Sequence, residues 1–406
     1  MSNKTPFAWD DPLFVDQQLT EEERMVQQSA RDYAQDRLMP RVLMANRHEN
    51  FDREIMNEFG ELGMLGATLP EKYGCSEVNY VCYGLMAREV ERVDSGYRSA
   101  MSVQSSLVMH PIFAYGTEAQ RERYLPKLAT GEWVGCFGLT EPDHGSDLGS
   151  VQTRAVRDGD DYLINGSKIW TTLGNFADHM ILLARTNTAV ERKYDGLSFF
   201  LAPMKIPGVD AHPIRKVTGE YGFNQIFFTD ARIPAETLMR EEGQGWGVAM
   251  KTLEYERGVS AGQASGYWMV SIQMDDAVDQ LRTYQRDGEP LLADPIARDD
   301  TIKLIMEAKA SALAGSRMRI GRLTSDYPMG LPLSSKYRWT EYARRMKLFT
   351  ASMQGAHSAL YVGDEEACQG GFWQRAYFSN FGATIGGGTS EVQANIIAEH
   401  VLGLPK

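Results

Sequence analysis

Two segments in the middle of the chain, a polar turn with glycines and an aromatic-hydroxyl stretch at a strand end, have residue types suited to holding a flat, polar ligand. The first, residues 137–147, reads FGLTEPDHGSD, and the second, residues 168–172, reads KIWTT. A turn of the first kind offers backbone N–H groups and hydroxyls to a polar ring or a phosphate. In the second, an aromatic side chain followed by hydroxyls can stack on a ring and hydrogen-bond to its edge. The competing interpretation is two ordinary tight turns and a core tryptophan, and either motif alone favours it.

A glutamate in a predicted helix is a candidate for acid–base chemistry. Residues 253–257 read LEYER, within a segment from Trp246 to Ile272 whose apolar spacing predicts a helix. A carboxylate acts as a general base only when it lies within hydrogen-bond reach of the proton that it removes. On these residues alone, the simpler interpretation of Glu256 is a solvated helix glutamate beside an arginine.

A guanidinium next to a hydroxyl is the third feature that could have a chemical function. Residues 91–102 read ERVDSGYRSAMS, so Arg98 is followed directly by Ser99. This pair is well matched to a carboxylate ligand. The alternative is a salt bridge on the helix surface, for instance with Asp94 about one turn back.

Composition excludes several other classes of function. The 406 residues carry a net charge of −12 and no long basic block, which disfavours nucleic acid and anionic membranes as partners. The four cysteines and seven histidines show no metal-binding or disulfide spacing, so we expect no metal. Neither a transmembrane stretch nor a leader pattern is seen, and a cytoplasmic protein is expected.

The elements that must position these residues follow the order helical, then β, then helical, which predicts an α+β protein. Capping boxes begin at Thr20 and Thr117, each ahead of an apolar periodic run. Short apolar runs and the turn Asp158-Gly159 then predict strands and a hairpin. Helical spacing returns in the last part and is broken at 386–388. We therefore expect an N-terminal helical domain, 1–133, a middle β domain, 134–240, and a C-terminal helical domain, 241–406.

These motifs, in this order, resemble the acyl-CoA dehydrogenase family over essentially the whole chain. Residues 91–102 are most similar to glutaryl-CoA dehydrogenase, and the C-terminal GGTSE-type motif is similar to bacterial fatty-acyl-CoA dehydrogenases. The resemblance implies a β-barrel-like middle domain, a C-terminal four-helix bundle and non-covalently bound FAD. It further implies a homotetramer that passes electrons to electron-transfer flavoprotein.

The resemblance also assigns residues to the flavin. Phe137, Leu139 and Thr140 would line it, with Thr140 near the pyrimidine side. Trp170 would cover the ring, and Thr172 would hydrogen-bond near N5. Ser146 would lie near both the cofactor and the acyl-pantetheine. In the GGTSE-type motif, Thr389 and Glu391 are further candidates for cofactor contact.

The position of the catalytic base is the main departure from the common family pattern. Many members carry a glutamate in a Tyr-Glu-Gly-Thr motif, but the matching residues 386–389 are GGGT. A branch that includes isovaleryl- and long-chain acyl-CoA dehydrogenases places the base in a Leu-Asp-Leu-Glu-Arg-like motif, which Leu253–Arg257 resembles. Glu256 is therefore the predicted base, with Glu391 as the rival carboxylate. By the same resemblance, the backbone N–H of Gly387 would stabilise the thioester oxygen.

The expected substrate depends on the motif at residues 91–102 and on the glycines that replace the family's Tyr-Glu pair at 386 and 387. By resemblance, Arg98 and Ser99 would bind a distal carboxylate, Glu91 would help to handle that end, and Arg257 would lie near the mouth of the acyl-CoA site. For Arg257 the alternative is a salt bridge to Glu254. Glycines at 386 and 387 leave room for a bulky substituent, so a substituted succinyl- or glutaryl-CoA, such as benzylsuccinyl-CoA, is expected.

Other enzymes of related fold are the competing hypotheses. A decarboxylating glutaryl-CoA dehydrogenase and a branched- or medium-chain acyl-CoA dehydrogenase are the nearest. An acyl-CoA oxidase would have a longer C-terminal region. A flavin monooxygenase would lack the base at both sites, and a DNA-associated relative would need a basic tract. The usual motifs for the adenine end of FAD are weak here, at 282–288 and 369–371.

Overall fold

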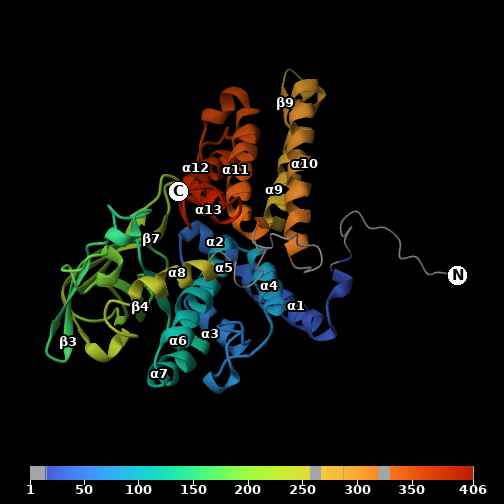
Figure 1. Ribbon diagram of the computed structural model, residues 1–406. Coiled ribbons are helices and arrows are strands. Elements are labelled where there is room, and N and C mark those ends of the chain that lie inside the picture. The colour runs from blue at the N-terminus through green and yellow to red at the C-terminus, as the bar shows by residue number, and fades with distance from the viewer. Residues whose placement is uncertain (1–13, 15, 257–266, 287, 319–329, 406) are drawn as a thin grey trace. The chain divides into compact units, whose positions relative to one another are not determined.

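The computed structural model describes residues 14, 16–256, 267–286, 288–318 and 330–405, and the chain divides into two compact units (Figure 1). One unit is residues 22–261, and the other combines residues 1–21 with 262–406.

The first unit opens with helices, some of which begin at a capping side chain. The predicted capping box is confirmed: the Thr117 hydroxyl accepts the N–H of Gln120, whose side chain accepts the N–H of Thr117. The apolar run after α4 is interrupted where the Asp94 carboxylate caps the next helix. The helices are α1 Glu21–Tyr33, α2 Met39–His48, α3 Glu54–Glu61, α4 Tyr80–Glu91, α5 Ser95–Ser102, α6 His110–Tyr115 and α7 Glu118–Ala129, with π-helical turns η2 Ala34–Leu38 and η4 Val103–Met109.

A mixed, eight-stranded sheet follows in the same unit (Figure 1). Its strands are β1 Gly135–Gly138, β2 Arg154–Asp158, β3 Asp161–Thr171, β4 His179–Arg185, β5 Leu197–Pro203, β6 Val209–Arg215, β7 Tyr221–Pro234 and β8 Leu238–Met239. The order is β6-β7-β3-β2-β4-β5-β8, with β1 parallel to β4. The predicted hairpin is confirmed, because β2 and β3 pair antiparallel around Gly159, whose φ is +64°.

Strand β4 is buried on both faces and separates two apolar cores. Ile181 and Leu183 belong to the core that the helices share with the sheet. Met180 and Leu182 belong to a second core between strands. A strand covered on both sides needs a continuous apolar run rather than alternation, which is why MILLA was recognisable as a strand.

A buried glutamine joins the helical part to the first strand. Gln104, in η4, donates to the carbonyls of Leu128 at 2.9 Å and Trp133 at 2.8 Å, and its side-chain oxygen accepts the N–H of Gly135 at 2.8 Å. The amide thereby uses both its donor and its acceptor side on backbone groups next to β1, which fixes where the strand begins.

The remaining helices lie at the end of the first unit and in the second. Helix α8, Gly245–Glu256, packs against η4, α6 and β5. The predicted continuous helix over 246–272 corresponds to α8 and the start of α9, and residues 257–266 between them lie outside the described part. The second unit contains α9 Tyr267–Thr283, α10 Pro295–Met318, α11 Gly330–Ser352, α12 Phe372–Ile385, α13 Ser390–His400 and the short strands β9 Gln285–Arg286 and β10 Glu289–Pro290. Its core is built around Met274, Tyr342, Met346 and Trp373.

Candidate functional site

The two turns that the sequence predicts to hold a cofactor meet where β1 and β3 end. The N–H of Ile169 donates to the carbonyl of Thr140 at 2.9 Å, and the Lys168 ammonium donates to the carbonyl of Leu139 at 3.1 Å. Thr140 and the residue before Trp170 are therefore joined by a backbone hydrogen bond between the two segments. Phe137, one residue before the end of β1, is half-buried against the core shared by helices and sheet.

Trp170 leaves the strand pattern in a way that exposes its ring. Its φ is +62°, in the left-handed region that a bulky residue rarely adopts, and the pairing of β3 with β7 is irregular at this point. The residue is 53% exposed, and Phe223 meets its ring edge-on with centroids 5.9 Å apart. This backbone conformation is held by the surrounding sheet, and it leaves a broad aromatic face open beside Thr140.

Polar atoms beside Trp170 also suit the edge of a ring ligand. Within the described residues, the hydroxyl of Thr171 and the side-chain oxygen of Asn224 are buried without a hydrogen-bond partner, and the two residues pair across β3 and β7. Thr140 and Thr172 are half-buried next to them. An accessible aromatic face with unsatisfied polar groups behind it fits a flat heterocycle such as the isoalloxazine ring of FAD.

Ser146 lies on an exposed loop that is anchored on its C-terminal side. Asp147 accepts hydrogen bonds from Lys193 at 2.5 Å and Ser150 at 2.6 Å. The buried guanidinium of Arg185 donates to the carbonyls of Gly149 at 2.7 Å and Val151 at 3.1 Å. The serine is thus presented at the surface from a supported loop.

Glu256 is the last residue of α8, and its side chain lies outside the described part, as does Arg257. Upstream in the helix, Ala249 and Thr252 are completely buried. Position 256 follows them at spacings of seven and four residues along α8.

The glycine segment that replaces the common base lies between α12 and α13. Gly387 has φ +67°, and a Cβ built on it would meet nothing within 4 Å. The carbonyl of Gly387 accepts from Gln393 at 3.0 Å, and that of Gly388 accepts from Lys336 at 2.7 Å. The segment is therefore held through its backbone in a conformation that suits glycine.

Thr389 and Glu391 both belong to the start of α13. The Thr389 hydroxyl caps the helix by accepting the N–H of Val392 at 3.2 Å. Glu391 is exposed, and hydrogen bonds from its own N–H and from Thr389 lower the pKa of its carboxyl. A lowered pKa makes Glu391 a weaker base, which argues against it as the rival of Glu256.

The predicted carboxylate-binding residues form an ion-paired cluster on α4 and α5. Buried Glu91 accepts hydrogen bonds from the guanidinium of Arg98 and the hydroxyl of Ser95, and Arg98 also donates to Ser102 at 3.2 Å. Asp94 is not the partner of Arg98, because its carboxylate caps α5. Ser99, like Arg98, is half-buried.

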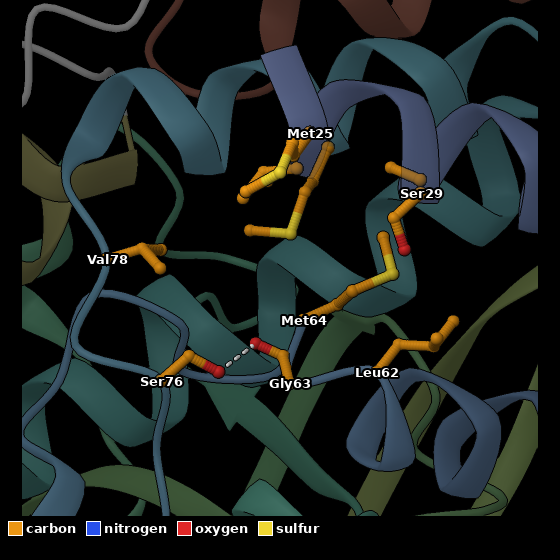
Figure 2. A pocket seen from close by; sticks show the side chains of 10 residues that line it. Met25, Ser29, Leu62, Gly63, Met64, Ser76 and Val78 are labelled. Atoms are coloured by element: carbon orange, nitrogen blue, oxygen red, sulfur yellow. Dashed lines mark hydrogen bonds between the residues drawn. The ribbon is translucent and has the colours of Figure 1, made fainter. Parts of the chain in front are cut away.

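A cavity of about 310 Å³ lies in the helical part and is lined by none of the predicted site residues (Figure 2). Ser76 closes one side by donating to the carbonyl of Gly63 at 2.9 Å. Three of its ten lining residues are methionines, whose flexible side chains can adjust to its shape. The lining residues are Met25, Val26, Ser29, Ala30, Leu62, Gly63, Met64, Ser76, Val78 and Met86.

Among the residues that the structure describes, no helix combines the length and the apolar character needed to cross a bilayer. No group of three or more His, Cys, Asp or Glu side chains in this described part of the chain is arranged to hold a metal ion.

Three family models match the chain in order: the acyl-CoA dehydrogenase N-terminal domain over 20–132, the middle domain over 136–231 and the C-terminal domain over 243–402. The chain therefore belongs to the acyl-CoA dehydrogenase family. It is an FAD-dependent oxidoreductase that dehydrogenates an acyl-CoA, and the expected α+β fold class is confirmed.

Individual relatives extend over nearly the whole chain. Acyl-CoA dehydrogenase IpdE1 of Mycobacterium tuberculosis is 37% identical over 363 residues, which covers 88% of this chain and 90% of that protein. The mitochondrial short-chain specific acyl-CoA dehydrogenase of Mus musculus is 30% identical, covering 95% and 91%. A glutaryl-CoA dehydrogenase from Mycobacterium smegmatis, solved in complex with FADH2, has a TM-score of 0.76 at 29% identity and covers 96% of each chain.

Proposed function

We propose that this enzyme oxidises an acyl-CoA that carries a distal carboxylate, with Glu256 as the base that removes the α-proton. When bound, FAD supplies the hydride acceptor for the β-carbon. The observation that carries the proposal is the left-handed glycine at 387, where many relatives have their base, together with a glutamate at the end of α8. Loss of the carboxylate at one position is matched by a carboxylate at the other.

The chain would hold the cofactor and substrate through groups already described. Trp170 would cover one face of the flavin, and Phe137, Leu139, Thr140 and Thr172 would contact its remaining edges. The N–H of Gly387 would donate to the thioester oxygen as negative charge develops there during α-proton removal. Such a donor stabilises the transition state only if it is in place beforehand, and the hydrogen bonds to its neighbouring carbonyls would keep it there.

The distal carboxylate is assigned to Arg98 and Ser99. Arg98 is already oriented through Nε by Glu91 and through Nη1 by Ser102, and Nη2 takes part in neither hydrogen bond. A guanidinium oriented in this way can present Nη2 to a carboxylate. With room beside Gly387, a substituted succinyl- or glutaryl-CoA is the favoured substrate. We infer simple dehydrogenation rather than oxidative decarboxylation.

Further parts of the proposal concern assembly and location. Electron-transfer flavoprotein would accept the electrons, and the enzyme would act as a homotetramer in the cytoplasm. The proposed domain limits are 1–133, 134–240 and 241–406. Size measurement by light scattering on the holoenzyme tests the tetramer.

A substrate screen tests the function. Oxidised holoenzyme is mixed without oxygen with glutaryl-, benzylsuccinyl-, isovaleryl- and straight-chain acyl-CoAs, and loss of flavin absorbance is followed while products are weighed by mass spectrometry. We expect the dicarboxylyl thioesters to reduce the flavin fastest and to lose two hydrogens only. Reduction by monocarboxylyl thioesters alone would refute the substrate class, and loss of CO2 would show decarboxylation.

A further inference from the structure

A completely buried ion pair lies directly behind the two predicted flavin-contacting segments. The Lys168 ammonium is 2.8 Å from the Glu141 carboxylate, and the side chains are 0% and 5% exposed. Lys168 precedes Trp170 by two residues in β3, and Glu141 follows Thr140 directly after β1. The two charges are therefore one or two residues from groups expected to touch the cofactor.

The hydrogen bonds of this pair join three segments of the chain. Glu141 accepts from the N–H of Gln152 at 2.6 Å and of Thr153 at 2.8 Å, just before β2. Lys168 donates to Glu141 and also to the carbonyl of Leu139 at 3.1 Å. The end of β1, the start of β2 and the end of β3 are thus tied to one buried point.

Burial and pairing act on the two groups in opposite ways. Burial lowers the pKa of Lys168 to about 8, although the neighbouring carboxylate raises it. Burial also raises the pKa of Glu141, but Lys168 and the N–H of Gln152 outweigh that effect and lower it overall. Both groups are therefore charged near neutral pH, and together they add no net charge beside the site.

Stability alone does not account for a buried pair of this kind. Desolvating two charges is expensive, and well-packed apolar side chains in their place are often as stable or more so. An apolar pair, however, could not form hydrogen bonds with the two N–H groups and the carbonyl that converge here. What the charges provide is a fixed spacing between segments.

We propose that Lys168 and Glu141 are positioning residues for the flavin: they hold Thr140 and Trp170 at the spacing that the ring requires and keep the local field neutral. The inference rests on the proposed contacts of Thr140 and Trp170 with FAD. Its electrostatic consequence is specific. Reduction adds negative charge to the flavin, so a nearby unbalanced cation favours the reduced form and an unbalanced carboxylate disfavours it.

Three variants separate positioning from simple stability: Glu141→Gln, Lys168→Met and the double variant. We expect each single variant to bind FAD roughly tenfold more weakly, within the range of couplings inside one buried network. The flavin reduction potential should fall in Lys168→Met. In Glu141→Gln, Lys168 loses the carboxylate that raises its pKa, so the potential should rise as the pH is lowered and the ammonium is protonated. In the double variant the potential should return towards the wild-type value while FAD binding remains weak.

Glu58→Gln is the matched control. Glu58 is a largely buried carboxylate in the same unit, bonded to Arg41 at 2.5 Å and Tyr33 at 2.7 Å, but on α3. This variant should lower thermal stability without changing the flavin potential. If Lys168→Met does not fold, the nearly isosteric Glu141→Gln carries the test.

FAD dissociation is measured by ultrafiltration, and the potential by equilibration with reference dyes. Folded single variants with wild-type FAD affinity and wild-type flavin potential would overturn the inference. Single variants that lose thermal stability but keep the wild-type flavin potential would also overturn it. Failure of the proposed function is distinguishable, because a wild-type enzyme that holds FAD but is reduced by no acyl-CoA still permits both measurements.

Discussion

Returning a glutamate to position 387 should not rescue an enzyme that has lost Glu256. The loop backbone at Gly387 has φ +67°, and the space around its missing Cβ is open. The obstacle is therefore conformational: a side chain in the left-handed region costs about 1–3 kcal/mol. If the loop relaxes to avoid that cost, the N–H of Gly387 moves away from the thioester oxygen, and loss of one such donor lowers the rate about 10²–10³-fold.

The test compares Glu256→Gln with the double variant that also carries Gly387→Glu. In both variants, the bound flavin should be reduced about 10²–10⁴-fold more slowly than in wild type, because general base catalysis usually contributes a factor of this size. The rate is followed by stopped-flow absorbance. Gly403→Ala is the matched control, because its φ is +65° and its surroundings are equally open. It should lose similar stability and keep full activity. A double variant within tenfold of the wild-type rate would refute the reasoning.

Three further predictions follow from the same contacts. Glu256→Gln alone should slow flavin reduction by about 10²–10⁴-fold while FAD remains bound in the visible spectrum; normal turnover would show that the base is elsewhere. Arg98→Met should lower kcat/KM for dicarboxylyl thioesters by roughly 10–150-fold, the value of a hydrogen bond to a charged group, and spare monocarboxylyl ones; equal losses would remove the carboxylate role. Burial raises the pKa of Asp178, but hydrogen bonds from Lys205 and the N–H of Val134 outweigh this and lower it. Its stabilisation is therefore complete above the unfolded value of about 4 and is lost as pH falls through the folded pKa. Asp178→Asn should destabilise the protein at pH 7 in urea titrations and flatten the loss between about pH 5 and pH 3; an unchanged slope would contradict this.

Elements with local signals were predictable from the sequence. The capping box at Thr117 and the turn at Gly159 each act through neighbours within a few residues, so their sequence patterns suffice. Strand β6 has no such signal, because Val209–Arg215 carries Pro213 and lies at the sheet edge, mostly exposed, without an apolar alternation. Helix α12 has none either, because its aromatic residues and Gly382 give no clear helical periodicity.

The candidate site was predictable by residue type but not by partner. The motif that contains Lys168 pointed to a cofactor, yet its ion pair with Glu141, 27 positions away, has no local signature. Likewise, Arg98 was expected to pair with Asp94 if it had a structural role, but Asp94 caps α5 and Glu91 takes its place. Pairing across a fold depends on which segments meet, and spacing along the chain does not contain that information.

The amide of Gln104 has a consequence for the alignment of the edge that is predicted to contact the flavin. In a strand, successive side chains point to opposite faces, so a slip of one residue exchanges them. Cys136 now faces the inter-strand core and Phe137 the opposite side. Gln104 hydrogen-bonds to the residues on either side of Val134, and these bonds oppose such a slip. A slipped strand would place the thiol of Cys136 where the ring of Phe137 now lies.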